Sequence, residues 1–248
     1  MDQTAALDQV KPYRDSKLSK KEQVTGMFDH IAFRYDLMNH LLSLGIDRIW
    51  RRRAIALLRA FHPRTLLDVA TGTGDLAIAA SRTLGCEKIV GIDLSRAMLA
   101  IAQKKVDEAA PEGVISLEAG DGEAINFPDG SFDAVTVGFG LRNFENLEKG
   151  LREMARVLRK GGKLVILEFS PVEQFPVKQL FHFYFHRVTP RVGKWVSRDS
   201  SAYGYLPESV RAFPPAGEMV QILNRSGFHS ASCKKMTFGI CSIFVASR

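Results

Sequence analysis

The sequence predicts an α/β protein with a Rossmann-like fold: a mostly parallel seven-stranded sheet with helices on both faces and an antiparallel C-terminal hairpin. Three observations predict this class. Apolar runs of strand length alternate with helix-length segments between residues 65 and 169. A glycine-rich turn follows the first of these runs, and two further apolar runs lie close together near the C-terminus. Regular alternation implies right-handed crossovers, and hence a parallel sheet covered on both faces.

The segment before this alternation predicts a tail and two helices. Residues 1 to about 18 are polar and lack periodicity, which predicts a mobile tail. Apolar residues recur at helical spacing from residue 22 to residue 42, and Gly45 ends that helix. Asp47 is the expected N-cap of a second helix, which Pro63 stops. We therefore expect residues 1–62 to cap the functional site and residues 63–248 to form the main domain.

Each later element has a local reason. The expected strands are apolar and rich in β-branched residues, at 65–69, 88–93, 115–119, 132–137 and 163–169. The expected helices are 75–83, 95–110 with Ser95 as its cap, and 147–159. Beyond residue 170, the pattern predicts an aromatic helical face at 181–188, a loop at 203–215, and a hairpin from the runs 228–236 and 240–246.

Composition limits the class of protein. The chain has 248 residues, 46% hydrophobic and 25% charged, as in an ordinary globular enzyme. No apolar run is long enough to span a bilayer and the polar start does not resemble a signal peptide, so we expect a cytoplasmic protein. Three scattered cysteines without metal-type spacing predict reduced thiols and no metal site.

The net charge of +7 is consistent with more than one function. Basic residues gather at 48–53 and again at 187–198. Such runs form solvated helix faces, or they attract an anionic membrane surface or a nucleic acid. Charge alone does not separate these readings.

The most informative stretch is the glycine-rich turn Asp68-Val69-Ala70-Thr71-Gly72-Thr73-Gly74-Asp75. Its glycines let the backbone approach a nucleotide closely. Asp68 and Asp75 flank the turn, where their charges would repel a pyrophosphate at the start of the following helix. The same charges would attract an ammonium or a sulfonium. The turn therefore favours S-adenosylmethionine as the cofactor.

Carboxylates also end the next two predicted strands. Asp93 is placed to accept hydrogen bonds from ribose hydroxyls, and Asp121 with Gly122 to bind the adenine edge. Ligands of parallel α/β sheets bind at the carboxyl ends of the strands. The residues of this predicted cofactor site are Asp68, Gly72, Gly74, Asp93, Asp121 and Gly122.

A nicotinamide-dependent dehydrogenase is a rival reading. The glycine-rich turn also fits the dinucleotide fingerprint, with Asp93 about 20 residues further on. Three features count against a dehydrogenase. They are the two acids beside the turn (Asp68 and Asp75), the further carboxylate of Asp121, and the final hairpin.

Three other stretches are more specific: Tyr35-Asp36-Leu37-Met38-Asn39, Gly140-Leu141-Arg142-Asn143 and Leu167-Glu168-Phe169-Ser170. They resemble the bacterial demethylmenaquinone and ubiquinone-precursor C-methyltransferases, and the resemblance runs from about residue 24 to the C-terminus. It implies the class I fold of S-adenosylmethionine-dependent methyltransferases. It also implies that the family's cofactor contacts fall on Thr73, Asp93, Asp121 and Gly122.

The resemblance implies methylation of a ring carbon of a membrane-resident prenylated quinol, most readily demethylmenaquinol to menaquinol. The ring carbon can attack once a quinol hydroxyl loses or shares its proton, which requires a base or a cation that stabilises the phenolate. Arg142, directly after the fourth strand, is the expected cation. His40 and Tyr205, together with Asp36, are candidates for proton handling.

A membrane-resident substrate also implies contact with a membrane. We expect peripheral attachment to the inner face of the cytoplasmic membrane through the aromatic segment 181–185 and through Arg187, Arg191 and Lys194.

Several alternatives stay open. The substrate can be the 2-polyprenyl-6-methoxy-benzoquinol precursor of ubiquinone, and the protein can be a scaffold that binds the cofactor without catalysis. A nucleic-acid methyltransferase is a further rival, although such enzymes often carry an Asn/Asp-Pro-Pro-aromatic block where this chain has Gly138-Phe139-Gly140-Leu141-Arg142. We expect no nucleic-acid partner, and a homo-oligomer stays open.

Overall fold

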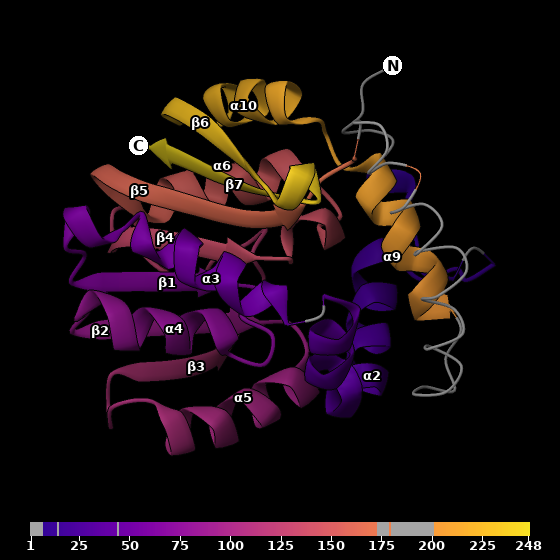
Figure 1. Cartoon of the computed structure of the whole chain (residues 1–248), viewed down its shortest axis with the longest axis horizontal. Coiled ribbons are helices and arrows are strands. Elements are labelled where there is room, and N and C mark those ends of the chain that lie inside the picture. Colours follow the sequence, from indigo (N-terminus) through magenta and orange to yellow (C-terminus); the bar gives the residue numbers. More distant parts are fainter. Residues whose placement is uncertain (1–6, 14, 44, 173–178, 180–200) are drawn as a thin grey trace.

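Figure 1 shows the computed structural model of the chain, which describes residues 7–13, 15–43, 45–172, 179 and 201–248. A seven-stranded sheet has the order β3-β2-β1-β4-β5-β7-β6. Its strands are β1 (Thr65–Val69), β2 (Lys88–Asp93), β3 (Ile115–Ala119), β4 (Phe132–Gly138), β5 (Leu158–Phe169), β6 (His229–Met236) and β7 (Cys241–Ser247). Neighbours from β3 to β5 are parallel, whereas β7 is antiparallel to both β5 and β6. The predicted fold class is confirmed.

Helices cover both faces of the sheet. They are α2 (Lys20–Leu42), α3 (Ile46–Ala56), α4 (Asp75–Leu84), α5 (Arg96–Ala109), α6 (Leu147–Val157), α9 (Ser201–Ala212) and α10 (Ala216–Arg225), with short helices η1 (Arg59–Phe61), η2 (Leu141–Asn143) and η4 (Thr237–Gly239). The main core lies against α6 and α10, and a second core on the other face lies against α3 and α4. Within β1, Leu67 and Val69 enter the main core and Leu66 the second.

The strand order places a crevice at one edge of the sheet. β1 and β4 are neighbours, although β2 and β3 lie between them in the chain. The chain therefore leaves the carboxyl ends of β1 and β4 in opposite directions, which opens a space between the two loops. Figure 1 shows α2 at this end of the sheet. The crevice therefore lies between the loops that follow β1 and β4, at the end of the sheet where α2 lies.

The ends of the helices test the predicted caps. Ser95 is confirmed as the N-cap of α5, because its Oγ accepts a hydrogen bond from the Met98 N–H at 3.1 Å. The prediction for Asp47 is wrong, since α3 begins at Ile46 after Gly45, whose φ is 76°. Glycine adopts this left-handed conformation easily, so the chain reverses earlier than expected. Asp47 instead accepts a hydrogen bond from Ser43 Oγ at 2.6 Å.

The predicted loop at 203–215 and the described part of the predicted tail both contain structured, buried residues. The predicted loop at 203–215 contains α9, with Pro207 inside the helix. Tyr205 and Phe213 are buried, so the packing of their apolar surface outweighs the turn-forming composition. Leu7, in the predicted mobile tail, is fully buried in the main core. These two predictions are wrong because the decisive contacts join segments far apart in the sequence.

Some predictions are not tested by the fold. The aromatic helix at 181–188 lies outside the described residues, as do Arg187, Arg191 and Lys194. The division between residues 62 and 63 stays a prediction, although Trp50 of α3 shares the second core with the sheet. None of the helices in the described ranges is long and apolar enough to cross a membrane.

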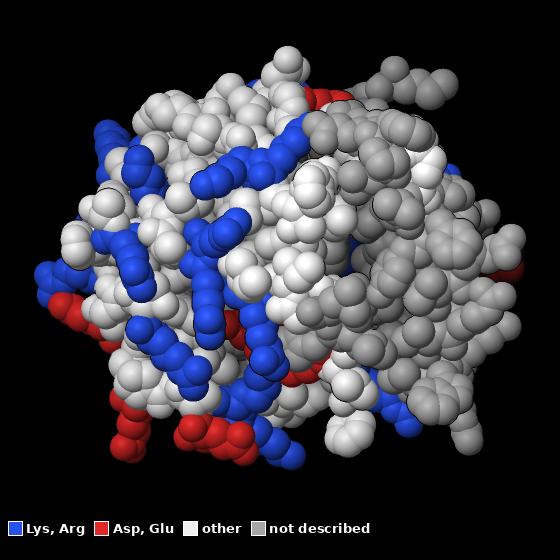
Figure 2. All heavy atoms as spheres, in the orientation of Figure 1, with Lys and Arg blue, Asp and Glu red and all other residues white. Residues whose placement is uncertain are grey.

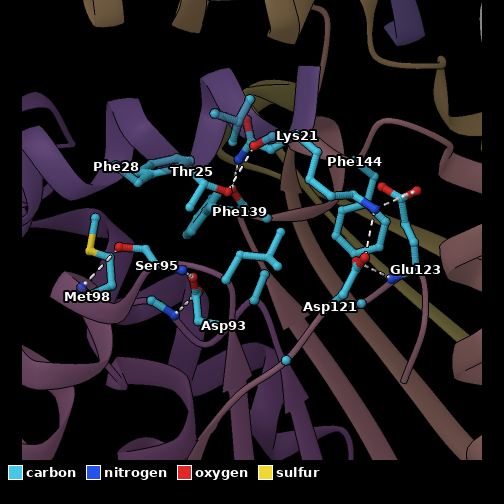
Figure 3. Close-up of a pocket in the computed structure, with 18 of the residues that line it drawn as sticks. Lys21, Thr25, Phe28, Asp93, Ser95, Met98, Asp121, Glu123, Phe139 and Phe144 are labelled. Carbon is cyan, nitrogen blue, oxygen red and sulfur yellow. Dashed lines mark hydrogen bonds and ion pairs between the residues drawn. The ribbon is translucent and has the colours of Figure 1, made fainter. Parts of the chain in front are cut away.

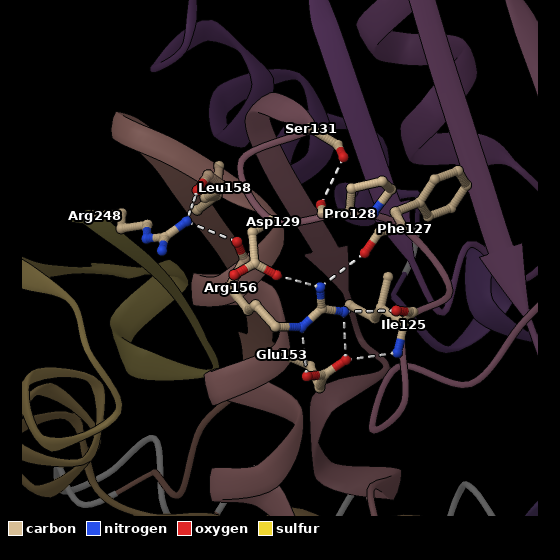
Figure 4. A network of polar contacts seen from close by, with 9 residues as sticks. All are labelled: Ile125, Phe127, Pro128, Asp129, Ser131, Glu153, Arg156, Leu158 and Arg248. Carbon is tan, nitrogen blue, oxygen red and sulfur yellow. Dashed lines mark hydrogen bonds and ion pairs between the residues drawn. The ribbon is translucent and has the colours of Figure 1, made fainter.

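A polar network fixes the segment that joins β3 to β4 (Figure 4). Arg156 of α6 donates hydrogen bonds to the carbonyl oxygens of Ile125 and Phe127 at 2.7 and 2.8 Å. It also pairs with Glu153 and Asp129, each at 2.8 Å. Glu153 in turn accepts a hydrogen bond from the Ile125 N–H. The network therefore anchors residues 125–129 to α6, directly after the part of this segment that reaches the crevice.

Candidate functional site

A cavity of about 700 Å³, its open mouth included, occupies the crevice (Figure 3). The turn after β1, the ends of β2 and β3, the segment after β4 and one face of α2 form its walls. The residues that line it are Lys21, Val24, Thr25, Phe28, Tyr35, Ala70, Gly72, Asp93, Leu94, Ser95, Met98, Gly120, Asp121, Gly122, Glu123, Gly138, Phe139, Gly140, Asn143 and Phe144.

Two of the predicted glycines have a steric reason. Gly72 has a φ of 58°, a left-handed conformation that brings the turn backbone to the cavity. A Cβ on Gly122 would lie 2.6 Å from Phe144 Cζ and 2.8 Å from Val69 Cγ1, so a side chain does not fit there. Position 122 therefore requires glycine for space, whereas the backbone conformation at Gly72 favours it.

Asp93 lies at the end of β2 and faces the cavity (Figure 3). One carboxylate oxygen accepts a hydrogen bond from the Gly72 N–H and the other from the Ser95 N–H, both at 2.8 Å. Burial raises the pKa of Asp93, and these two bonds oppose the rise. Each carboxylate oxygen has a second lone pair, so the fixed carboxylate can still accept from a vicinal diol such as a ribose.

Asp121 reaches the cavity from the other side and binds a cation of α2. Lys21 Nζ lies 2.7 Å from Asp121 Oδ2 and 3.5 Å from Glu123 Oε2. Desolvation lowers the pKa of Lys21, but the two carboxylates raise it by more. The sequence carries no motif at Lys21 or Glu123 that would predict a site residue. Their pairing links segments about 100 residues apart, which no local motif marks.

Asp68 does not line the cavity. It is fully buried beneath the turn, where its oxygens accept hydrogen bonds from Thr71 Oγ1 at 2.7 Å and Thr136 Oγ1 at 2.6 Å. Burial raises the pKa of Asp68 to about 6, and the two hydroxyl bonds oppose the rise. Asp68 therefore holds the turn through Thr71. Its contact with a methionine ammonium stays a prediction.

Thr73 is hydrogen-bonded to α2. Its Oγ1 donates to Asp36 Oδ1 at 2.5 Å, and Lys105 Nζ of α5 contacts Asp36 at 2.7 Å and Asp75 at 2.5 Å. Neither Thr73 nor Gly74 lines the cavity. The network ties α2 to the glycine-rich turn and to α5, so it fixes the wall of the cavity. It gives Asp36 a structural role, whereas proton handling by Asp36 stays a prediction.

Arg142 lies in η2, directly after β4, with its side chain only 7% exposed. Its Nη1 donates to Glu168 Oε1 at 2.8 Å and to the Phe139 carbonyl oxygen, and its backbone N–H donates to Glu168 Oε2. Its Nε is buried without a hydrogen-bond partner in the described structure. The same holds for Oδ1 of Asn143, which lines the cavity. Unpaired buried groups of this kind cost about 1–3 kcal/mol each unless a ligand satisfies them.

The other two catalytic candidates differ. Tyr205 is buried, and its phenol oxygen has no hydrogen-bond partner among the residues that the structure describes. Burial raises the pKa of Tyr205, so its phenol stays protonated near neutral pH and is a donor, not a base. The His40 side chain lies outside the described residues. Tyr35, the first residue of the Tyr35-Asp36-Leu37-Met38-Asn39 stretch, also lines the cavity, and burial raises its pKa.

The charge of the cavity wall discriminates between cofactors. Among the described lining residues, Asp93, Asp121 and Glu123 are acidic and Lys21 is the basic one, already paired with two of them. This wall disfavours a pyrophosphate and suits a ligand with an ammonium and a sulfonium. Val24, Phe28 and Phe139 add apolar surface. The residues present therefore fit S-adenosylmethionine.

Comparison with known proteins gives an independent result. The model of the ubiE/COQ5 methyltransferase family matches residues 16–248. The chain is 48% identical to demethylmenaquinone methyltransferase of Bacteroides fragilis, over 97% of this chain and 98% of the relative. It is 46% identical to a ubiquinone/menaquinone biosynthesis C-methyltransferase of a Geobacter species, over 92% of this chain and 97% of the relative.

A likeness to a solved structure supports the fold. A SAM-dependent methyltransferase of Thermotoga maritima superposes with a TM-score of 0.65, covering 90% of this chain and 98% of that one. At 18% identity this likeness shows the fold alone.

Proposed function

The chain belongs to the ubiE/COQ5 methyltransferase family, and on that basis we propose that it methylates a ring carbon of demethylmenaquinol to give menaquinol, with S-adenosylmethionine as the methyl donor. The observation that carries the proposal is the 48% identity to a demethylmenaquinone methyltransferase over nearly the full length of both chains. The acidic residues of the cavity wall disfavour phosphate groups, which supports S-adenosylmethionine as the cofactor.

On the cofactor side, the residues of the chain bind S-adenosylmethionine and orient it. Bound S-adenosylmethionine supplies an electrophilic methyl group. Asp93 accepts from the ribose hydroxyls, while Asp121 and the backbone at Gly122 bind the adenine edge. Asp68 and Thr73 hold the glycine-rich turn from beneath and from α2, and Gly72 lets its backbone approach the methionine end. Methyl transfer to carbon depends mainly on alignment and on exclusion of water. The fixed turn and the fixed Asp93 carboxylate serve the alignment.

On the acceptor side, the chain must stabilise negative charge. A quinol hydroxyl that shares its proton raises the electron density at the neighbouring ring carbon. Arg142, fixed by Glu168 and next in the chain to the lining residue Asn143, is the cation that stabilises the phenolate. Its Nε is buried without a hydrogen-bond partner among the described residues. Tyr205 is a second donor for the ring oxygens. His40 remains the candidate base.

The runner-up is methylation of the benzoquinol precursor of ubiquinone, because one near-full-length relative is named for both pathways. The test compares kcat/KM of the purified protein for demethylmenaquinol and for the benzoquinol precursor with the same prenyl tail. We expect a preference of about 10-fold or more for the naphthoquinol. The reverse preference would assign the benzoquinol, and turnover of neither would contradict a quinol substrate.

The substrate lies in a membrane, and the surface suggests how the protein reaches it. Phe238, in η4, is 73% exposed, and Ile49 of α3 is 49% exposed. Trp50 Nε1 donates to Thr237 Oγ1 at 2.8 Å. This bond joins α3 to η4, the two elements that carry these exposed apolar side chains, which we call the apolar tips. η4 lies just before Cys241, which pairs with Phe169 at the carboxyl end of β5. The tips therefore lie at the same edge of the sheet as the cavity.

Basic residues surround these tips. Arg48, Arg52 and Arg53 on α3 are exposed, as are Lys234 and Lys235 on β6. Figure 2 shows Lys and Arg side chains spread over the face on which Figure 1 places α3. Each basic residue close to an anionic lipid surface contributes about 1 kcal/mol of attraction. We propose that this edge contacts the cytoplasmic face of the membrane.

Flotation with lipid vesicles tests this contact. We expect binding to anionic vesicles at low salt, loss of binding at high salt and none to neutral vesicles. The variant Arg52→Ser/Arg53→Ser should bind more weakly, and Phe238→Ser should weaken binding at every salt concentration at which the wild type still binds. Arg82→Ser, at an exposed arginine of α4, is the matched control. Flotation that none of these changes affects would contradict the proposed edge.

A further inference from the structure

Lys20 is a buried lysine that the proposed chemistry does not use. It begins α2 and its exposure is 0%. Its Nζ donates to the carbonyl oxygen of Leu7 at 2.8 Å and to that of Arg142 at 3.4 Å. Its backbone N–H donates to Glu145 Oε1 at 3.0 Å. One ammonium thus joins the N-terminal segment, the start of α2 and the peptide that carries Arg142.

The bond to Arg142 completes the support of that residue. Glu168 holds the guanidinium and the backbone N–H of Arg142. Lys20 holds its carbonyl oxygen, from the opposite end of the same residue. The next residue, Asn143, lines the cavity. A shift of this peptide would therefore move both Arg142 and the cavity wall.

The N-terminal segment keeps Lys20 in place. Leu7 is fully buried in the main core, which fixes the carbonyl oxygen that Lys20 binds. Further along, Tyr13 packs against the cluster formed by Val24, Met27 and Tyr205, and its N–H donates to Gln23 Oε1 at 2.9 Å. The segment thus touches the elements that carry Lys20 and Tyr205.

The charges around Lys20 are mixed. Asp8, Glu123 and Glu145 favour its ammonium, whereas Arg142 opposes it. Burial is the largest influence and lowers the pKa of Lys20 to about 8. A buried charge at this cost is a poor stabiliser of a fold, because an apolar residue of similar size often serves stability as well or better. The contacts of Lys20 are better explained by the geometry that they impose on the Arg142 peptide.

We propose that Lys20 is a positioning residue of the methyl-transfer site, which fixes the Arg142 peptide against the cavity by tying it to the N-terminal segment. The proposal rests on the proposed role of Arg142. It assigns Lys20 no contact with substrate or cofactor.

The first test is Lys20→Met, which keeps the apolar stem and removes the ammonium. We expect kcat to fall about 10- to 100-fold, with the Kd for S-adenosylmethionine unchanged within about twofold, because Asp93 and Asp121 are untouched. The thermal midpoint should stay the same or rise. Lys17→Met, at an exposed lysine nearby, should leave all three quantities unchanged. An unchanged kcat in Lys20→Met would overturn the proposal, and so would a lowered midpoint that alone accounts for the loss of activity.

The pH profile separates positioning from a merely structural role. As pH rises through about 8, Lys20 loses its charge, so the ratio of wild-type kcat to that of Lys20→Met should shrink. Glu145→Gln, at a partly exposed position, removes a charge that favours the ammonium and should move this change to lower pH. It does so with Lys20 still present, so it tests the proposal even if Lys20→Met does not fold. The proposal would be overturned if the ratio of the two kcat values did not change with pH and the pH profile of kcat did not shift in Glu145→Gln.

These results are distinguishable from a failure of the proposed function. If Arg142 variants retain full turnover, the role of Arg142 is wrong whatever Lys20 does. If Arg142 variants lose turnover and Lys20→Met does not, only the role of Lys20 is wrong.

Discussion

Asp93→Ala is expected to weaken the binding of S-adenosylmethionine by about 100-fold or more, measured by calorimetry. The carboxylate is fixed at the cavity wall by the N–H groups of Gly72 and Ser95. Hydrogen bonds to a charged acceptor are worth about 1.5–3 kcal/mol each, and a ribose diol makes two. The substitution also frees the Gly72 N–H, so the glycine-rich turn loses its tie to β2.

Two comparisons sharpen this prediction. Asp107→Ala removes an exposed carboxylate of α5 and should leave the affinity unchanged. In the wild type, the affinity should fall as pH falls through the raised pKa of Asp93, because protonation removes an acceptor. Unchanged affinity in Asp93→Ala would refute the ribose assignment.

Arg142→Met is expected to lower kcat about 100- to 1000-fold, the loss seen when a fixed donor to developing negative charge is removed. Cofactor binding should stay nearly intact, since Arg142 is not among the residues that line the cavity. Stability should also fall, because Glu168 is fully buried and loses its ion-pair partner. Breaking a buried pair in this way costs about 3–5 kcal/mol.

The loss of stability needs its own control. In the double variant Arg142→Met/Glu168→Gln the uncompensated charge is gone, so we expect most of the thermal stability to return. Turnover should remain low. If turnover returns together with stability, Arg142 holds the fold and is not the cation of the reaction.

Much of the fold was predictable because its signals are local. The strands of the parallel sheet are short apolar runs, and the turn after β1 carries glycine where φ is positive, at Gly72. Asp93 and Asp121 were predictable as site residues because parallel strands bring their carboxyl ends to one edge. The structure places both on the cavity.

The rest depends on contacts that no local pattern marks. No local pattern distinguishes Lys20 or Lys21, yet one is buried against Leu7 and Arg142 and the other pairs with Asp121. α9 contains Pro207 and is held by buried side chains such as Tyr205. In each case tertiary packing outweighs local propensity. Asp68 illustrates the converse: the motif predicts a cofactor contact for it, which stays a prediction, whereas its partners in the structure are threonine hydroxyls beneath the turn.

The central claim is that this cavity delivers a methyl group to a ring carbon of a quinol. The most direct measurement follows a ¹³C-labelled methyl group from S-adenosylmethionine into product, with the purified protein, demethylmenaquinol and NMR detection. The account predicts one labelled methyl on the naphthoquinol ring carbon for each S-adenosylhomocysteine released. Label on a hydroxyl oxygen, or cofactor consumed with no labelled quinol, would contradict it.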